Sequence, residues 1–237
     1  MSVVSIEDGY DFRVLVLDDT WVIRTPRRES CAEMLAIEAQ LLPLLAPTLP
    51  VRVPAFEYVG DFAVYRYLEG APLVDEEEGV REFLIALHAF DAGGLPVPGP
   101  DWLEMYNRHA DDFRRLIVPL LDVDERPRAE ALFAEIDTLT GFEPVLTHAD
   151  LGPEHLLCRD GALVAVIDWG DVRIGDPALD YSWLLNVPFP HWDVDDEIRR
   201  RARFYHRMGP WFEAHHGVFL EKPANVERGL AGISSRL

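Results

Sequence analysis

The chain has 237 residues, 49% of them hydrophobic, and it carries 42 acidic against 22 basic side chains, a formal net charge of −20. This length and apolar content allow a buried core and exclude a disordered chain. The charge makes nucleic acid a poor partner, because phosphate binding requires clustered positive charge. It favours a cationic small molecule, although acidity alone also serves to keep a protein in solution.

No apolar run reaches the roughly 18 residues of a membrane-spanning helix, so no membrane partner is predicted. Residues 1–12 lack the basic and apolar regions of a secretory signal. The two cysteines, Cys31 and Cys158, are too far apart in sequence to indicate a disulfide framework or a zinc site. Together these features predict a cytoplasmic protein. Lys222 is the only lysine, so a cation in the active site must be an arginine.

The first part of the chain reads as a small sheet with one helix. A turn at Asp18 and Asp19 separates two of the predicted strands, as in a hairpin. Apolar side chains at helical spacing predict a helix from Ser30 to Leu45, with Ser30 and Glu33 as a capping box. Pro43 marks the end of that helix or a kink in it. The strands are predicted over residues 12–17, 21–24, 51–59 and 62–68.

Beyond Gly70 the apolar pattern becomes helical, interrupted by one short β-rich segment. That segment has strands near residues 145–147, 156–158 and 163–167, the last two joined by a turn as a hairpin. The pattern indicates an α+β fold with a small β-rich N-terminal lobe, residues 1–67. A larger helical lobe, residues 68–237, would contain the hairpin. Helices are predicted over residues 77–90, 101–121, 126–139 and in the chain from residue 176 onward.

Side chains with catalytic potential gather at the ends of this hairpin. The sequence His148-Ala149-Asp150-Leu151 precedes it, His155 follows five residues after Asp150, and Ile167-Asp168-Trp169-Gly170 ends it. Because a hairpin brings its ends together, Asp150 and Asp168 can face one space that His155 can enter. One carboxylate to align a hydroxyl and a metal-binding pair are the minimum for phosphoryl transfer. Mg²⁺ prefers a few carboxylates together with waters and phosphate oxygens.

This pattern resembles the catalytic loop and metal motif of the aminoglycoside and macrolide phosphotransferases, which are relatives of the protein kinases. The resemblance implies a bilobal protein-kinase-like fold, with Asp150 as the catalytic carboxylate and His155 and Asp168 as Mg²⁺ ligands. His155 stands where the kinase pattern has Asn, a departure also seen in the 2″-type aminoglycoside and the macrolide phosphotransferases. Neutral imidazole can still bind a metal. His148 and Asp180 resemble residues that support the loop.

The N-terminal part resembles the nucleotide-binding lobe of the same family. Arg24 takes the place of the phosphate-binding lysine, and an arginine is longer and planar, so the two are not interchangeable. Glu38 resembles the glutamate that pairs with this cation, the simpler interpretation being an exposed helical side chain. Tyr67 and Leu68 resemble the hinge that packs against the nucleotide base, although Tyr67 is equally compatible with an ordinary strand aromatic.

The resemblance implies a phosphotransferase that moves the γ-phosphate of ATP or GTP to a hydroxyl of an aminoglycoside antibiotic, with Mg²⁺ as cofactor. A macrolide or other small-metabolite kinase is one alternative, and a catalytically inactive nucleotide-binding relative is another. The acidic run at residues 193–197 could pair with ammonium groups of the acceptor. It is also typical of a helix N-terminus, where the helix dipole favours carboxylates, and this second interpretation is the favoured one.

Overall fold

The computed structural model of the chain describes all residues except 1, 7–8, 76–77, 100 and 188–193. Its packing defines two compact units, residues 1–98 with 145–192, and residues 99–144 with 193–237. All the site residues predicted from the sequence lie in the first of these units. The division into lobes at residue 67 follows a different criterion and stays a prediction.

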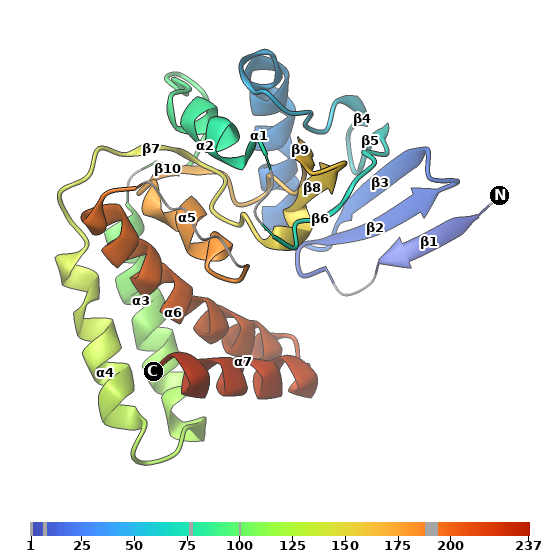
Figure 1. The fold of residues 1–237 in the computed structure, drawn as a ribbon. Helices are drawn as coiled ribbons and strands as arrows, with labels where there is room; N and C mark the ends of the chain where they lie inside the picture. Colours follow the sequence, from blue (N-terminus) through green and yellow to red (C-terminus); the bar gives the residue numbers. More distant parts are fainter. Residues whose placement is uncertain (1, 7–8, 76–77, 100, 188–193) are drawn as a thin grey trace. The chain divides into compact units, whose positions relative to one another are not determined.

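Three antiparallel sheets and three helices make up the first unit (Figure 1). The sheets have the strand orders β1-β2-β3-β5-β4, β6-β8-β9 and β10-β7. The strands are β1 Val3–Ile6, β2 Phe12–Leu17, β3 Trp21–Pro26, β4 Phe56–Val59, β5 Ala63–Arg66, β6 Ala71–Pro72, β7 Val145–Thr147, β8 Leu156–Arg159, β9 Ala162–Val166 and β10 Arg173–Gly175. The helices are α1 Glu29–Leu45, α2 Val80–His88 and α5 Ala178–Leu184, with 3-10 turns at Ala46–Thr48 and Pro153–His155.

The pairing of the five-stranded sheet decides which side chains share a face. Arg24 on β3 lies opposite Val14 on β2 and Ala63 on β5. Directly paired residues point to the same side of a sheet, so these three side chains occupy one face. Helix α1 packs on this face through Leu35 and Cys31, which form a buried cluster with Ala63.

Helix α1 belongs to two hydrophobic clusters at once. Its N-terminal half packs on the five-stranded sheet, whereas Leu41, Leu42 and Leu45 belong to a larger core that also contains Phe83 of α2 and Trp169. Burial of such side chains is the main favourable term in folding, at ~25 cal/mol per Å² of apolar surface. Because α1 is fixed on both sides, its middle turn is held rigidly, and Glu38 lies in that turn.

The predicted start of α1 is wrong, and so is a capping box at Ser30. The helix begins at Glu29, and its N-cap Arg28 makes no side-chain capping hydrogen bond. Pro43 lies inside the helix, which continues to Leu45. A proline in a helix interior removes one backbone hydrogen bond. The buried leucines of the last turns hold the helix together despite this loss.

The sheets differ from the sequence prediction, which also lacked the short strands β6 and β10. The sequence did not predict β1, which adds an exposed edge strand to the sheet. The strand expected from Val51 begins only at Phe56. The backbone of Arg52 instead pairs with β9, accepting a hydrogen bond from Val166 at 2.9 Å and donating one to Val164 at 3.1 Å. This segment therefore connects two sheets. It pairs with β9 at Arg52 and then continues into β4 of the five-stranded sheet.

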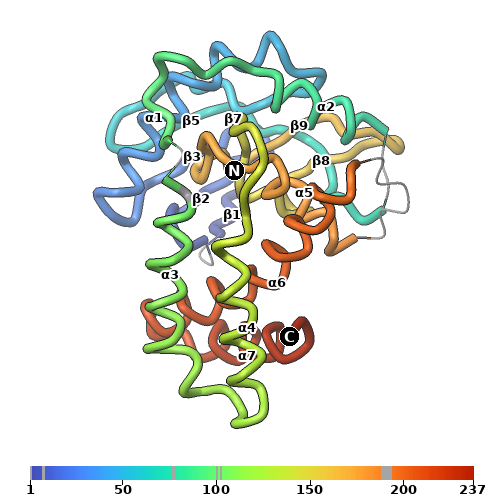
Figure 2. Tube along the Cα trace, turned by 90° about the vertical axis from the view of Figure 1, so that its left-hand side faces the viewer, coloured from blue at the N-terminus to red at the C-terminus, as the bar shows by residue number. Residues whose placement is uncertain are grey.

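The second unit is helical, with α6 and α7 packed closely against each other (Figure 2). Its helices are α3 Trp102–Leu116, α4 Arg126–Ala134, α6 Asp196–Phe219 and α7 Pro223–Arg236, with 3-10 turns at Val118–Leu120 and Ile136–Thr138. Asp195 caps α6 by accepting a hydrogen bond from the Ile198 amide at 2.8 Å. The helix-start interpretation of the acidic run is therefore confirmed for residues 195–197, while residue 193 lies outside the described residues.

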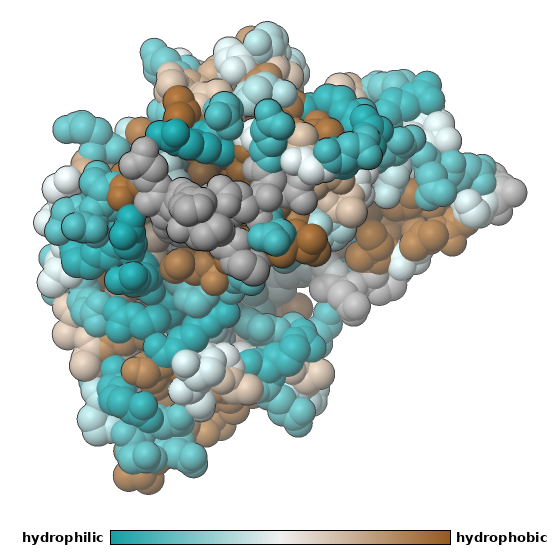
Figure 3. Space-filling model, viewed as in Figure 1, coloured by the Kyte–Doolittle hydropathy of each residue, from teal (hydrophilic) through white to brown (hydrophobic). Residues whose placement is uncertain are grey.

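Hydrophilic side chains cover much of the face seen in Figure 3, as the composition leads one to expect. Exposed apolar side chains occur on β1, where Val3, Val4 and Ile6 are each about half exposed. Within the described part of the chain, no helix is both long enough and apolar enough to cross a bilayer.

The contact between α6 and α7 leaves no room for a side chain at Gly229. A Cβ atom there would lie 2.6 Å from the Cβ of Ala214 and 2.5 Å from its amide nitrogen. Overpacking of this kind costs ~1–3 kcal/mol. We expect Gly229→Ala to lower the free energy of unfolding by about 2 kcal/mol in urea denaturation.

Gly209→Ala is the matched control for this prediction. Gly209 lies in α6, and a Cβ atom there would meet only the flexible end of Arg236, at 3.7 Å. Alanine is favoured over glycine in a helix by ~1 kcal/mol, so this variant should be unchanged or slightly more stable. Equal destabilisation by the two substitutions would contradict the packing argument.

Candidate active site

The loop after β7 begins with a buried, neutral histidine. The His148 side chain is fully buried, and its Nε2 donates a hydrogen bond to the Ile167 carbonyl at 3.0 Å. Burial and, to a smaller extent, the positive charge of nearby His155 lower the pKa of His148 to about 4. His148 therefore joins the start of the loop to the segment before Asp168 and takes no part in proton transfer at neutral pH.

Asp180 of α5 anchors the backbone of this loop. Its buried carboxylate accepts hydrogen bonds from the amides of His148 at 3.2 Å and Ala149 at 2.9 Å. His88 at the end of α2 donates a third, at 2.9 Å. Ala149 has φ of 66°, a conformation unfavourable for a residue with a Cβ atom. The three hydrogen bonds to Asp180 stabilise this strained turn, which directs the next residue, Asp150.

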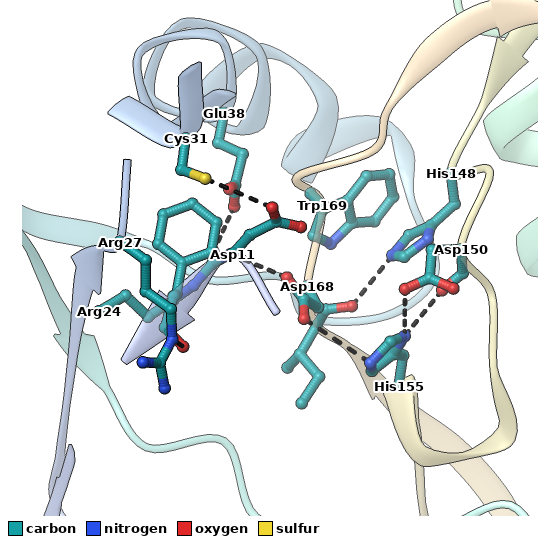
Figure 4. A network of polar contacts seen from close by, with 12 residues as sticks. Asp11, Arg24, Arg27, Cys31, Glu38, His148, Asp150, His155, Asp168 and Trp169 are labelled. Carbon is teal, nitrogen blue, oxygen red and sulfur yellow. Dashed lines mark hydrogen bonds and ion pairs between the residues drawn. The ribbon is translucent and has the colours of Figure 1, made fainter. Parts of the chain in front are cut away.

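His155 lies between the two carboxylates that the sequence predicted to converge (Figure 4). Its Nδ1 donates a hydrogen bond to the main-chain carbonyl of Asp150 at 2.7 Å and lies 3.6 Å from Oδ2 of the same residue. Its Nε2 lies 3.7 Å from Oδ2 of Asp168, which is too long for a hydrogen bond. The structure thus brings Asp150, His155 and Asp168 together at the ends of the β8–β9 hairpin.

Arg24 and Glu38 meet Asp168 from the other side (Figure 4). Nη1 of Arg24 donates to Oε2 of Glu38 at 2.6 Å, and Nη2 donates to Oδ1 of Asp168 at 2.8 Å. Glu38 is fully buried, so its interpretation as an exposed helical side chain is wrong. Burial raises the pKa of Glu38 to about 7, and the Arg24 charge opposes this shift.

The site concentrates negative charge. Burial, opposed by His155 and reinforced by the carboxylates of Asp171 and Asp168, raises the pKa of Asp150 to about 7. Burial opposes protonation of His155, but Asp150 and Asp168 outweigh it and raise the pKa of the imidazole. Burial would raise the pKa of Asp168 as well, yet Arg24 and His155 lower it. Positive charge close to Asp168 and His155 is therefore favoured in this site.

The donor atoms fit a magnesium ion bound together with a phosphorylated ligand. The hydrogen bond from Nδ1 to a carbonyl directs Nε2 of His155 toward Asp168, so a metal ion that displaces the Nε2 proton would meet the arrangement usual for a metal-binding histidine. Among the described residues, no three His, Cys, Asp or Glu side chains form a complete metal site. Mg²⁺ does not require one, because waters and phosphate oxygens supply most of its ligands.

The residues predicted to contact a nucleotide base border a small apolar surface. Val16, Val22 and Tyr65 form a buried cluster on the five-stranded sheet, and Tyr67 packs against it. The Tyr67 amide donates a hydrogen bond to the Thr20 carbonyl at 2.9 Å, which fixes the chain after β5. Leu68 follows and is partly buried. The contact of Tyr67 and Leu68 with a nucleotide stays a prediction.

Sequence reasoning missed two residues of this site. Asp171 lies three residues after Asp168 and contributes negative charge to it, and the acidic Asp168-Trp169-Gly170-Asp171 sequence is the signal that could have indicated this. His88 supports Asp180 from a different helix. It ends an amphipathic helical pattern, so no local signal distinguished it from a surface residue.

The loop should depend on Asp180 for stability. Asp180→Ala leaves two buried amides without acceptors, so we expect a loss of about 3 kcal/mol in the free energy of unfolding, measured with urea. Asp195→Ala is the control, because it removes one exposed helix cap and should cost about 1 kcal/mol. Similar costs for both variants would show that Asp180 does not anchor the loop.

Comparison with known proteins shows the family of the chain. A model of the phosphotransferase enzyme family matches residues 2–216. Viomycin phosphotransferase of Streptomyces vinaceus is 32% identical over 142 residues, which are 51% of this chain and 48% of that protein. The alignment therefore spans only about half the length of that relative. The uncharacterized protein YcbJ of Bacillus subtilis is 26% identical, in an alignment that covers 86% of this chain and 74% of that protein.

Solved structures agree with the family match over the whole chain. The GDP and kanamycin complex of an aminoglycoside 2″-phosphotransferase has a TM-score of 0.88 and 25% identity, covering 100% of this chain and 93% of the other. A macrolide 2′-phosphotransferase from Brachybacterium faecium has a TM-score of 0.73 and 26% identity, covering 98% and 92%. The predicted kinase-like α+β fold is confirmed. The chain belongs to the phosphotransferase enzyme family.

Proposed function

We propose that this chain transfers the γ-phosphate of ATP or GTP to a hydroxyl of an aminoglycoside antibiotic. The observation that carries the proposal is the convergence of Asp150, His155 and Asp168 at the ends of one hairpin, in a chain of the phosphotransferase enzyme family. Phosphoryl transfer needs an aligned hydroxyl and a cation that offsets the negative charge of the phosphates. One of these three side chains can align the hydroxyl, and the other two can bind the cation.

Asp150 is the proposed catalytic carboxylate. Its side chain is 32% exposed, so it can meet a substrate while the loop backbone stays anchored by Asp180. A pKa near 7 suits a group that accepts the proton of an acceptor hydroxyl, because a general base works best near the operating pH. Asp150 therefore orients the hydroxyl and takes its proton as the oxygen bonds to the γ-phosphorus, while the bond from this phosphorus to the bridging oxygen breaks and the nucleoside diphosphate leaves.

His155 and Asp168 are the proposed Mg²⁺ ligands. When bound, Mg²⁺ offsets the charge on the phosphate oxygens of the donor. The hydrogen bond of His155 to the Asp150 carbonyl keeps Nε2 directed toward Asp168. Arg24 holds the other oxygen of Asp168. The two ligands are thus supported from opposite sides before a nucleotide binds.

A nucleoside triphosphate is the proposed donor. The partly buried Tyr67 and Leu68, next to the buried cluster that contains Tyr65, are the proposed packing site for the base. Arg24 lies on the face of the sheet that helix α1 covers, and Glu38 lies on that helix. Arg24 contacts both Glu38 and the proposed metal ligand Asp168. A similar protein solved with GDP supports a nucleotide as the donor.

The acceptor is proposed to be a cationic small molecule. The net charge of −20 favours a polycation, and a relative similar over the whole chain is solved with kanamycin. A macrolide is the second candidate, because a macrolide 2′-phosphotransferase is 26% identical and aligns over nearly the whole chain. We also propose a cytoplasmic location, because Cys31 and Cys158 are both buried thiols outside any disulfide. Neither nucleic acid nor a membrane is a proposed partner.

The direct test is a coupled assay for nucleoside diphosphate release in the presence of Mg²⁺. ATP and GTP should be run in parallel against aminoglycosides, macrolides and viomycin. We expect release that depends on an aminoglycoside. Release with macrolides alone would select the second candidate. Nucleotide binding without release for any acceptor would indicate the catalytically inactive relative.

Asp150→Asn should abolish that turnover while it preserves nucleotide binding. The amide keeps the shape of the side chain but cannot take a proton, so we expect kcat to fall by at least ~10²-fold. Nucleotide affinity, measured by calorimetry, should change little because Asp150 is not a proposed metal ligand.

Asp160→Asn is the control for this variant. Asp160 is exposed in the turn between β8 and β9 and has φ of 55°, a conformation that Asn tolerates. It should retain full activity. Full activity of Asp150→Asn, or loss of nucleotide binding in a correctly folded variant, would contradict the role assigned to Asp150.

A further inference from the structure

Arg24 is bound in a way that leaves it poorly placed to contact a phosphate. One guanidinium nitrogen donates to Glu38 at 2.6 Å and the other donates to Asp168 at 2.8 Å. The ring of Phe12 covers the guanidinium, with Cζ 4.1 Å from the ring centroid. Only 3% of the side chain is exposed. Arg24 is therefore enclosed by the two carboxylates, whose contacts Figure 4 shows, and by the ring of Phe12.

Release of Arg24 from this position would leave Glu38 without its partner. Glu38 is fully buried, and its second oxygen, Oε1, already has no hydrogen-bond partner. Removing one member of a buried ion pair is strongly destabilising, because the remaining charge is uncompensated. The pairing with Glu38 therefore holds Arg24 in place, and Arg24 in turn presents its other nitrogen to Asp168.

The Asp168 carboxylate depends on contacts with other residues for its position. It has φ of 61° and its side chain is 46% exposed, so neither its backbone conformation nor its burial fixes the carboxylate. Trp169, which is fully buried, holds the following residue. The bond from Arg24 to Oδ1 fixes the carboxylate itself and leaves Oδ2 directed at Nε2 of His155.

We propose that Arg24 is a positioning residue for the metal ligand Asp168 and serves nucleotide binding through that residue, without direct contact to phosphate. A planar guanidinium can bridge two carboxylates, whereas a lysine ammonium is a single point charge. An arginine at position 24 can therefore bind Glu38 and Asp168 at the same time. The inference rests on the proposed function and specifies how Arg24 contributes to it.

The test separates metal-dependent from metal-independent nucleotide affinity. Calorimetry would give the dissociation constants of ADP and GDP for the whole chain, once in EDTA and once in saturating Mg²⁺. The ratio of the two constants is the gain in affinity due to the metal. A positioning residue for Asp168 should change this gain, whereas a phosphate ligand should change the affinity in EDTA.

The variants are compared in a background that keeps the fold. Glu38→Gln removes the buried carboxylate, so Arg24→Met added to it leaves no unpaired charge at position 38, and the partly exposed Asp168 is the carboxylate that loses its partner. Asp168→Asn defines the effect of losing the ligand itself. Arg66→Met is the control, since Arg66 on the adjacent strand β5 pairs with Glu57 and stacks on Trp21, away from Asp168. Circular dichroism and thermal melting verify that each variant is folded.

We expect Arg24→Met in the Glu38→Gln background to lose about tenfold or more of the metal-dependent gain, approaching Asp168→Asn. Its affinity in EDTA should stay near that of Glu38→Gln. Arg24→Lys in the otherwise unchanged chain should also lose part of the gain. A tenfold loss in EDTA with the gain intact, or an unchanged gain, would overturn the inference. Absence of nucleotide binding by the unmodified chain would overturn the proposed function together with it.

Discussion

The ion pairs of one buried arginine connect three segments that are far apart in the sequence. Arg24 belongs to β3, Glu38 to α1, and Asp168 follows β9. Each segment is fixed by its own hydrophobic contacts, the sheet through Ala63 and the helix through Leu35. The arginine therefore fixes the positions of the proposed nucleotide-binding sheet and the proposed metal ligand relative to each other within this unit.

Buried ion pairs contribute little net stability, because desolvation of the charges offsets much of their attraction. The cluster around Arg24 is better explained by the specific geometry it imposes. Arg24 has two carboxylate partners, so its own charge is more than balanced, and its pKa stays above its ordinary value although burial opposes protonation. The excess negative charge falls on Asp168, on the side where a divalent cation is proposed. The desolvation free energy of burying Arg24 and Glu38 is thus the cost of the contact that positions Asp168.

Two strained backbone positions border the same site, and each is compensated nearby. Ala149 and Asp168 both have left-handed conformations that cost of order 1–3 kcal/mol each. Asp180 stabilises the first through the amides of His148 and Ala149. The packing of Trp169 and the bond from Arg24 stabilise the second. Such strain persists at functional sites because the surrounding structure over-determines it, and here the surrounding contacts can be named.

These compensating contacts explain how far the sequence could predict the site. The spacing of Asp150, His155 and Asp168 along a hairpin was readable, because a hairpin fixes the proximity of its own ends. The support from His88 was not, since it depends on how α2 packs against α5. The path of residues 51–55 was also unreadable, because a β-rich run does not reveal which sheet it joins. Local pattern thus predicted the reactive groups, whereas tertiary packing determined which side chains hold them in position.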